Sequence, residues 1–285
     1  MYIWFNGKLM DRQSASLSLQ DRGVLYGDGL FETFRVEKGT PMLEDAHLNR
    51  LRQGACLLRF AQVPEPEELK RGIRELLRAN RVRSGYLRIT LTRGIGGFGQ
   101  PLHRLTDISV WMEAREHPLD LSRYEQGVQA VVTSIRRNPY SPLTRVKSLN
   151  YLESVLARDE AAEAGVEEGI FRTVDGDVSE TASANLFLVQ DGCVVTPDVS
   201  RGLLPGIVRS WVLDTCTQRG WAWETRAVSV EELMKADEAF LTNSTWGPFP
   251  LVAVDGRSIG SGKPGPVTRE WISRWRKVAA GDSAE

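Results

Sequence analysis

The feature that most constrains the fold is a turn-rich segment near the middle of the chain, residues 116–122, which divides a long alternation of strand-like and helix-like stretches. The 285 residues are enough for one large domain or two medium ones. We therefore expect a two-domain α+β or α/β protein. A smaller α+β domain would span residues 1–118, a larger domain would span residues 123–285, and the linker would lie at about 116–122.

In the first half, apolar residues recur with the spacing of paired strands and amphipathic helices. Strands are predicted over residues 2–5, 30–36, 86–92 and 108–114. Asn6-Gly7 is a typical hairpin turn. One helix is predicted to be capped by Asp45 and to run through Leu58, and a second to cover residues 64–80.

The second half continues the same alternation. Strands are predicted over residues 128–135, 169–174, 185–190, 194–196, 221–227 and 238–242. Helices are predicted over residues 149–164, 207–218 and 266–280, and Gly165 is a typical residue to end the first of them.

The composition is that of an ordinary globular protein and argues against several functional classes. Apolar residues make up 41% and the net charge is −1, so neither a nucleic-acid nor a membrane partner is expected. No apolar stretch approaches the ~20 residues that span a bilayer, and the first eight residues carry no charged leader, so we expect a cytoplasmic protein. The three cysteines and three histidines are too scattered for a disulfide framework or a zinc site, and no metal is expected.

Three motifs, far apart in the sequence, together predict a site for an aromatic aldehyde phosphate. Lys147 follows a turn-rich stretch, and a lysine amine can form a Schiff base. Glu180 begins a run of small residues against which a flat ring can lie, and its carboxylate can pair with a ring nitrogen. Residues 206–208 open a helix whose first N–H groups attract phosphate. The combination indicates pyridoxal 5'-phosphate (PLP).

Each of these motifs also has an ordinary structural explanation. Taken alone, Lys147 fits a solvated lysine at the start of a helix, and Glu180 fits a surface residue after a turn. Residues 206–208 fit a plain helix start. Arg50 lies on the first predicted helix, where most arginines are surface charges, and it becomes a phosphate ligand only if the fold brings it to the cofactor.

The glycine-rich stretch over residues 94–99 fits the dinucleotide-binding pattern G-x-G-x-x-G only superficially. Gln100-Pro101 stands where that pattern requires the start of a helix, and no acidic residue ends a second strand about 20 residues later. We interpret this stretch as a loop over an active site.

Taken together, these residues resemble the fold-type IV PLP enzymes, which include branched-chain aminotransferases, D-amino acid aminotransferases and 4-amino-4-deoxychorismate lyases. The resemblance extends from about residue 3 to residue 253. The matching segments are residues 21–23, 26–33, 47–51, 147–151, 180–187, 204–209 and 236–238. This resemblance implies a D-amino acid aminotransferase-like architecture and a homodimer.

The same resemblance implies a role for each residue of the site. Lys147 would be the Schiff-base lysine and the proton carrier, and Glu180 the partner of the pyridine nitrogen. Tyr151 would hydrogen-bond the phenolic oxygen of the ring. The phosphate ligands would be Arg50, the amides of Ile207 and Val208, and Ser244.

The residues that distinguish lyases from aminotransferases in this family give a divided signal. Thr33 and Asn243 are typical of the lyases, although a strand threonine and a turn asparagine are also common for structural reasons. Phe98 stands where lyases often carry an arginine, and Arg93 or Arg104 could replace that arginine. The substrate-binding residues implied are Tyr26, Thr33, Arg93, Asn243 and Thr245.

We therefore predict a PLP-dependent 4-amino-4-deoxychorismate lyase that releases pyruvate and forms 4-aminobenzoate for folate biosynthesis. Lys147 would remove the ring proton and Thr33 would assist the departure of pyruvate. The alternative is a class IV aminotransferase that acts on branched-chain L-amino acids or on D-amino acids. A non-catalytic PLP-binding protein is a third hypothesis, against which the retention of Lys147, Glu180 and Arg50 argues.

Overall fold

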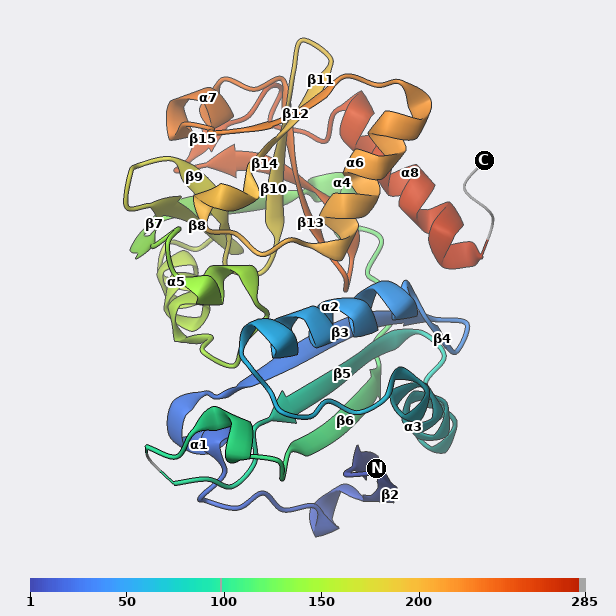
Figure 1. The fold of residues 1–285 in the computed structure, drawn as a ribbon. Helices are drawn as coiled ribbons and strands as arrows, with labels where there is room; N and C mark the ends of the chain where they lie inside the picture. Colours follow the sequence, from blue (N-terminus) through green and yellow to red (C-terminus); the bar gives the residue numbers. More distant parts are fainter. Residues whose placement is uncertain (98, 282–285) are drawn as a thin grey trace. The chain divides into compact units, whose positions relative to one another are not determined.

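The computed structural model describes residues 1–97 and 99–281, and the chain forms two compact units (Figure 1). The first unit comprises residues 1–119 together with Val146–Asn150, and the second comprises Asp120–Arg145 and the chain from Tyr151 onward. The boundary after Leu119 lies within the expected linker. The expected second domain would have included residues 146–150, but in the structure these residues belong to the first unit.

The first unit is built on a six-stranded antiparallel sheet in the order β2-β1-β6-β5-β3-β4. Helices α2 and α3 lie on one face of this sheet (Figure 1), because alternate strand residues such as Leu30, Phe34 and Val36 form one apolar core with them. The elements are β1 (Tyr2–Phe5), β2 (Lys8–Asp11), α1 (Arg22–Tyr26), β3 (Gly29–Glu37), β4 (Thr40–Pro41), α2 (Glu44–Leu57), α3 (Pro66–Ala79), β5 (Gly85–Thr92) and β6 (Ser109–Glu116).

A short extended segment, residues 147–149, pairs with the beginning of β3. The Phe31 amide donates to the Lys147 carbonyl and the Leu149 amide donates to the Gly29 carbonyl, both at 2.9 Å. Strand β4 occupies only the last two residues of the same edge of β3, so the rest of that edge is available to the segment. This pairing explains why the helix predicted from residue 149 begins only at Leu152.

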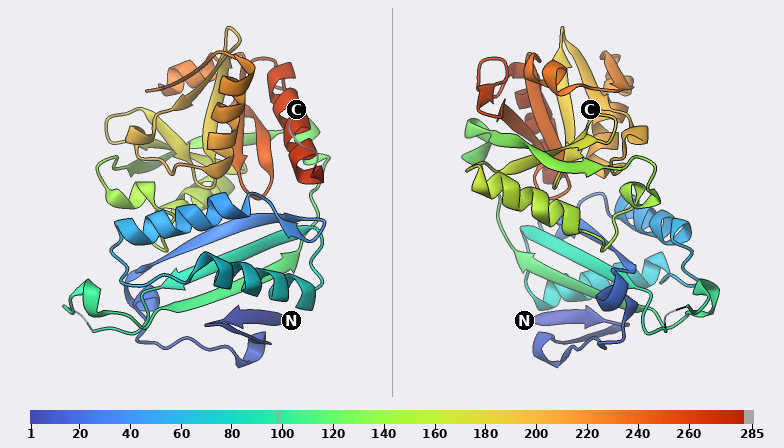
Figure 2. Two further views of the ribbon diagram at one scale, coloured as in Figure 1. Left: turned by 45° about the vertical axis from the view of Figure 1, so that its right-hand side comes forward. Right: turned by 90° about the vertical axis from the view of Figure 1, so that its left-hand side faces the viewer.

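The second unit contains a mixed nine-stranded sheet with apolar cores on both faces. Along β10, Leu186 and Leu188 enter one core, while Phe187 and Val189 enter the other. Helices α6 and α8 pack side by side through Trp211 (Figure 2), whose ring centroid lies 5.1 Å from that of Trp275. The strands are β7 (Val128–Arg137), β8 (Glu168–Thr173), β9 (Val178–Thr181), β10 (Asn185–Gln190), β11 (Cys193–Pro197), β12 (Trp223–Arg226), β13 (Glu238–Asn243), β14 (Gly247–Val254) and β15 (Arg257–Ser258). The helices are α4 (Arg123–Gln126), α5 (Leu152–Glu163), α6 (Ile207–Arg219), α7 (Val230–Met234) and α8 (Pro266–Ala280).

Most predicted elements are present within a few residues, and α8 has the predicted limits. The capping role predicted for Asp45 is wrong: Leu43, at φ 51°, precedes α2, and Asp45 lies in the first turn, where its charge favours the helix dipole. Strand β14 was not predicted because two prolines argue against a strand. It forms because β7 pairs with it only from Leu251 onward, beyond Pro248 and Pro250. Within the described residues, no helix combines the length and apolar character that crossing a membrane requires.

The contact between α3 and β1 gives a test of this packing. Replacement of a helical glycine by alanine normally stabilises a helix by about 1 kcal/mol. A Cβ atom on Gly72 would lie 2.6 Å from the Trp4 ring, however, so Gly72→Ala is expected to lower the free energy of unfolding by about 1–3 kcal/mol. Urea unfolding of the two proteins measures the difference, and a more stable variant would contradict the packing described.

Candidate active site

Lys147 lies on the face of the first unit's sheet that is opposite to α2. It stands across from Phe31 in the antiparallel pairing, and directly opposite residues point to the same face. Its Nζ lies 4.4 Å from the centroid of the Phe31 ring. Two further residues belong to this face, Thr33 on β3 and its register partner Arg88 on β5, whose guanidinium lies 3.8 Å from the same ring. An amine and a guanidinium therefore lie against one aromatic ring, and the Thr33 hydroxyl belongs to the same face of the sheet.

The other face of β3 carries a buried carboxylate. Glu32 points toward α2 and its side chain is 1% exposed. Arg50 donates from Nε to Glu32 Oε1 at 2.8 Å and from Nη2 to Oε2 at 2.7 Å, and His47 Nδ1 lies 2.7 Å from Oε2. Burial acts to raise the pKa of Glu32, but Arg50 and His47 outweigh it and hold this pKa at about 2. Burial also lowers the pKa of His47, so the imidazole is neutral at pH 7.

In the second unit, Glu180 lies on β9 and not in a loop. Its side chain is largely buried, and Oε2 accepts hydrogen bonds from Asn185 Nδ2 and from the Leu204 amide, both at 3.2 Å. Oε1 lies 3.5 Å from Arg137 Nη2. Contacts from both sides thus fix the orientation of this carboxylate.

The small residues that follow Glu180 form a tight turn with many hydrogen bonds. The Thr181 amide donates to the Ala184 carbonyl at 2.8 Å, and the Ala182 carbonyl accepts from Tyr151 Oη at 3.1 Å. Burial, with a contribution from the negative charge of Glu180, raises the pKa of Tyr151, so its phenol remains a hydrogen-bond donor. The turn therefore presents a flat, well-ordered strip of backbone.

Ile207 and Val208 are the first two residues of α6, and Gly206 precedes the helix without a side-chain cap. Amides at such a position have no partners within the helix and can bind an anion. A Cβ atom on Gly206 would lie only 1.9 Å from Asn185 Oδ1. Any side chain at residue 206 would therefore displace Asn185. Because Asn185 also donates to Glu180, such a change would alter the position of the carboxylate as well.

Ser244 lies in the turn between β13 and β14, and its neighbours are used to hold that turn. Asn243 Oδ1 accepts from the Thr245 amide at 2.9 Å, from Thr245 Oγ1 at 2.8 Å and from the Trp246 amide at 3.2 Å. Asn243 Nδ2 donates to the Ser183 carbonyl at 3.3 Å. Asn243 and Thr245 therefore have structural partners at the atoms expected to contact substrate.

Arg93, also expected to bind substrate, is 2% exposed and its donors serve the fold. Nε bonds to Asp28 at 2.9 Å, Nη1 to the Arg59 carbonyl at 3.0 Å and Nη2 to the Leu58 carbonyl at 2.7 Å. The three donor atoms of Arg93 therefore have their partners within the first unit. Tyr26, at the end of α1, is 42% exposed, and Phe98 lies outside the described residues.

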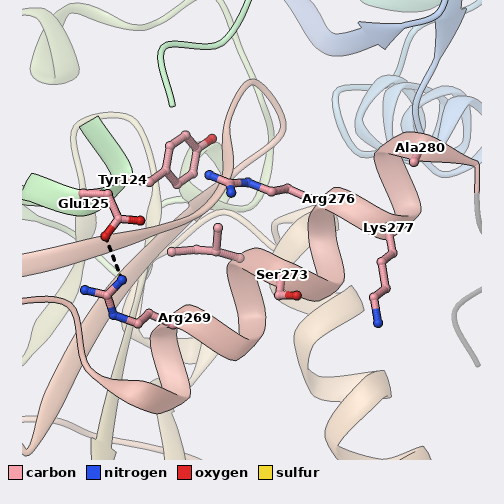
Figure 3. Close-up of a pocket in the computed structure, with 8 residues that line it drawn as sticks. Tyr124, Glu125, Arg269, Ser273, Arg276, Lys277 and Ala280 are labelled. Atoms are coloured by element: carbon pink, nitrogen blue, oxygen red, sulfur yellow. Dashed lines mark hydrogen bonds and ion pairs between the residues drawn. The ribbon is translucent and has the colours of Figure 1, made fainter. Parts of the chain in front are cut away.

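A pocket of about 390 Å³ in the second unit lies between α4 and α8 (Figure 3), and none of the residues predicted for the cofactor lines it. Arg269 Nη1 bonds to Glu125 at 2.7 Å across its mouth, and the Arg276 guanidinium lies 5.2 Å from the centroid of the Tyr124 ring. These two arginines already have partners within the second unit.

A family model places these residues in a known group: class IV aminotransferases match residues 29–254, and the chain belongs to this family. PLP is the cofactor of the family. D-alanine aminotransferase of Bacillus licheniformis is 33% identical over 94% of this chain and 94% of its own length. The structure of branched-chain amino acid aminotransferase from Escherichia coli is similar with a TM-score of 0.92 and 31% identity, over 100% of this chain and 99% of that one.

The lyases are represented by a more distant structure. A Legionella pneumophila protein, provisionally described as a 4-amino-4-deoxychorismate lyase, has a TM-score of 0.86 and 25% identity over 94% of this chain and 97% of that one. The mixed α/β fold expected from the resemblance is confirmed. The lyase activity expected from Thr33 and Asn243 is less well supported than the aminotransferase alternative.

The sequence did not identify several of the residues described above in the first and second units. Glu32 occurs between Leu30 and Phe34 at an inward-facing strand position, where a charged residue requires a buried partner. A charged residue among inward-facing apolar residues of a predicted strand is therefore a signal that could have identified Glu32. Arg88 and Asn185 carry no comparable local signal, because only the strand register and the turn geometry give them their partners.

The low pKa of Glu32 predicts how the stability of the first unit depends on pH. The pKa in the folded protein, about 2, lies below the ordinary 4.5, so the carboxylate stabilises the fold fully above about pH 5 and loses this effect as the pH falls toward 2. Between about pH 6 and pH 3, the natural protein should lose about 2 kcal/mol of unfolding free energy that Glu32→Gln does not lose. Urea unfolding across this range compares the two proteins, and equal pH slopes would contradict the ion pair.

Proposed function

We propose that this protein is a PLP-dependent aminotransferase whose substrates are branched-chain L-amino acids, with D-amino acids as the second candidate class. The family match over residues 29–254 is the observation that carries this proposal. The relatives described above support it, since a branched-chain enzyme and a D-alanine enzyme are both more similar to the chain than the lyase structure.

We further propose which residues of each unit bind PLP. Lys147 would attach the cofactor covalently, and the fixed carboxylate of Glu180 would keep the pyridine nitrogen protonated. Tyr151 would donate to the phenolic oxygen in place of the Ala182 carbonyl, which accepts its hydrogen bond in this structure. The phosphate would be held by Arg50, Ser244 and the first amides of α6, at Ile207 and Val208. The uncapped helix start and the small-residue turn fit such a group.

Arg88 supports substrates that carry a carboxylate. Its guanidinium and the Lys147 amine lie against the same Phe31 ring, and Thr33 is the register partner of Arg88 on that face. Arginine binds carboxylates through two parallel hydrogen bonds, and every amino acid and keto acid substrate of an aminotransferase has a carboxylate to offer. The ring and the threonine methyl group leave an apolar surface for an aliphatic side chain.

The chemistry then divides between cofactor and protein. Bound PLP supplies an electron sink for the carbon that loses its proton. Lys147 Nζ would be the base that removes the proton from the substrate's α-carbon and the acid that supplies a proton to the cofactor as the amino group is transferred. Arg88 holds the substrate carboxylate, and Tyr151 and Glu180 keep the ring oriented.

We also propose a homodimer. Leu152, Val155 and Leu156 expose 68%, 54% and 48% of their surface along α5, and burial of such an apolar strip against a second copy would be favourable. Sedimentation of the purified protein measures the assembly.

Incubation with single amino acids tests the activity. The PLP-loaded protein should lose the visible absorbance of its cofactor when L-leucine, L-isoleucine or L-valine is added without an acceptor. Subsequent 2-oxoglutarate should restore the absorbance and yield glutamate. D-alanine provides the comparison for the second substrate class.

Lys147→Ala is the control for this assay and should lower turnover by more than about 10²-fold. Thr33 keeps the lyase as a competing candidate. Formation of 4-aminobenzoate from aminodeoxychorismate, without any response to amino acids, would overturn the aminotransferase proposal.

Replacement of Arg88 by methionine tests the carboxylate contact. Loss of a charge-assisted hydrogen bond is expected to raise the KM for 2-oxoglutarate by about 10- to 100-fold, with a smaller effect on kcat. Arg115→Met is the matched control, because Arg115 lies exposed on the neighbouring strand β6. An unchanged KM in Arg88→Met would remove Arg88 from the substrate site.

A further inference from the structure

The contact between Glu32 and Arg50 is a two-point one. Both carboxylate oxygens are used, and they engage Nε and Nη2 along one edge of the planar guanidinium. Two parallel hydrogen bonds fix the plane of an arginine as well as its position. The Arg50 side chain is 13% exposed while Glu32 is 1% exposed, so the carboxylate approaches from the protein interior.

His47 completes this arrangement from the same helix. It lies one turn before Arg50 on α2, its Nδ1 is 2.7 Å from Glu32 Oε2, and its ring centroid is 4.3 Å from that of Phe34. The imidazole is therefore held by packing on one side and by the carboxylate on the other. Strand β3 and helix α2 are joined through a chain of three polar groups inside an apolar core.

We propose that Glu32, supported by His47, is the positioning residue of the phosphate site. It holds the Arg50 guanidinium so that the edge opposite to the carboxylate is presented to the cofactor phosphate. This inference rests on the proposed role of Arg50. Glu32 itself does not touch the cofactor and acts only through the arginine.

The sign of the effect distinguishes positioning from charge. A carboxylate near a phosphate dianion repels it, so removal of the negative charge alone would tighten PLP binding. Glutamine can accept only one of the two arginine hydrogen bonds, and its NH₂ group would oppose the other donor. If orientation of Arg50 dominates, Glu32→Gln weakens PLP binding in spite of the lost repulsion.

The experiment titrates the cofactor-free protein with PLP and, separately, with pyridoxal, which lacks the phosphate. Glu32→Gln should raise the Kd for PLP by about tenfold or more and leave the Kd for pyridoxal unchanged. Glu37→Gln is the matched control, because Glu37 lies on the same strand and pairs with a different arginine, Arg35, at 2.6 Å. It should change neither Kd.

Tighter or unchanged PLP binding in Glu32→Gln would overturn the proposal, and so would equal weakening of PLP and pyridoxal, which indicates general damage to the fold. Glu32→Asp retains the charge on a shorter side chain and serves if the glutamine variant does not fold; it should weaken PLP selectively. Arg50→Ala distinguishes the proposed phosphate role of Arg50 from the proposed positioning role of Glu32. If it leaves PLP binding unchanged, the proposed phosphate role of Arg50 is wrong, whereas weakening by Arg50→Ala but not by Glu32→Gln refutes only the positioning role.

Discussion

The pairing of residues 147–149 with the edge of β3 is the interaction on which the first unit's part of the site depends. Two main-chain hydrogen bonds of 2.9 Å place Lys147 opposite Phe31, and the register then decides which neighbours its amine meets. A shift by one residue would turn Lys147 toward α2 and into the apolar core. The backbone ladder therefore determines on which face of the sheet the Lys147 side chain lies.

Strand β3 serves both of its faces, and the alternation of side chains keeps the two tasks apart. Phe31 and Thr33 belong to the face of Lys147, whereas Glu32 between them reaches α2 and orders Arg50. Burying a carboxylate there is unfavourable in itself, and it is offset only because an arginine and a histidine satisfy both oxygens. Neighbouring residues of one strand thus set the positions of both the lysine and the predicted phosphate ligand, because Phe31 pairs with Lys147 and Glu32 binds Arg50.

The sequence predicted most elements and the family because both depend on local information. Periodicity gave α8 its limits, and Lys147, Glu180 and the glycine before α6 are recognisable by residue type and order. The sequence does not predict the partners of polar side chains, because these partners depend on tertiary packing. Arg93 was expected to bind substrate, yet its donors are occupied by Asp28 and by the carbonyls of the two residues that follow α2, Leu58 and Arg59.

This difference explains why the sequence predicts the family better than it predicts the reaction. Residues that bind the cofactor are common to aminotransferases and lyases, so recognising them leaves the reaction open. The distinguishing residues are single polar side chains that can equally serve the fold, and Asn243 is used to hold its own turn. With Asn243 and Arg93 accounted for in this way, the proposed discrimination among substrates depends mainly on the face of β3 and β5 that carries Phe31, Thr33 and Arg88. Arg88 would hold the carboxylate that every amino acid substrate carries, whereas the Thr33 hydroxyl on the same face is only a weak acid for a departing enolpyruvate.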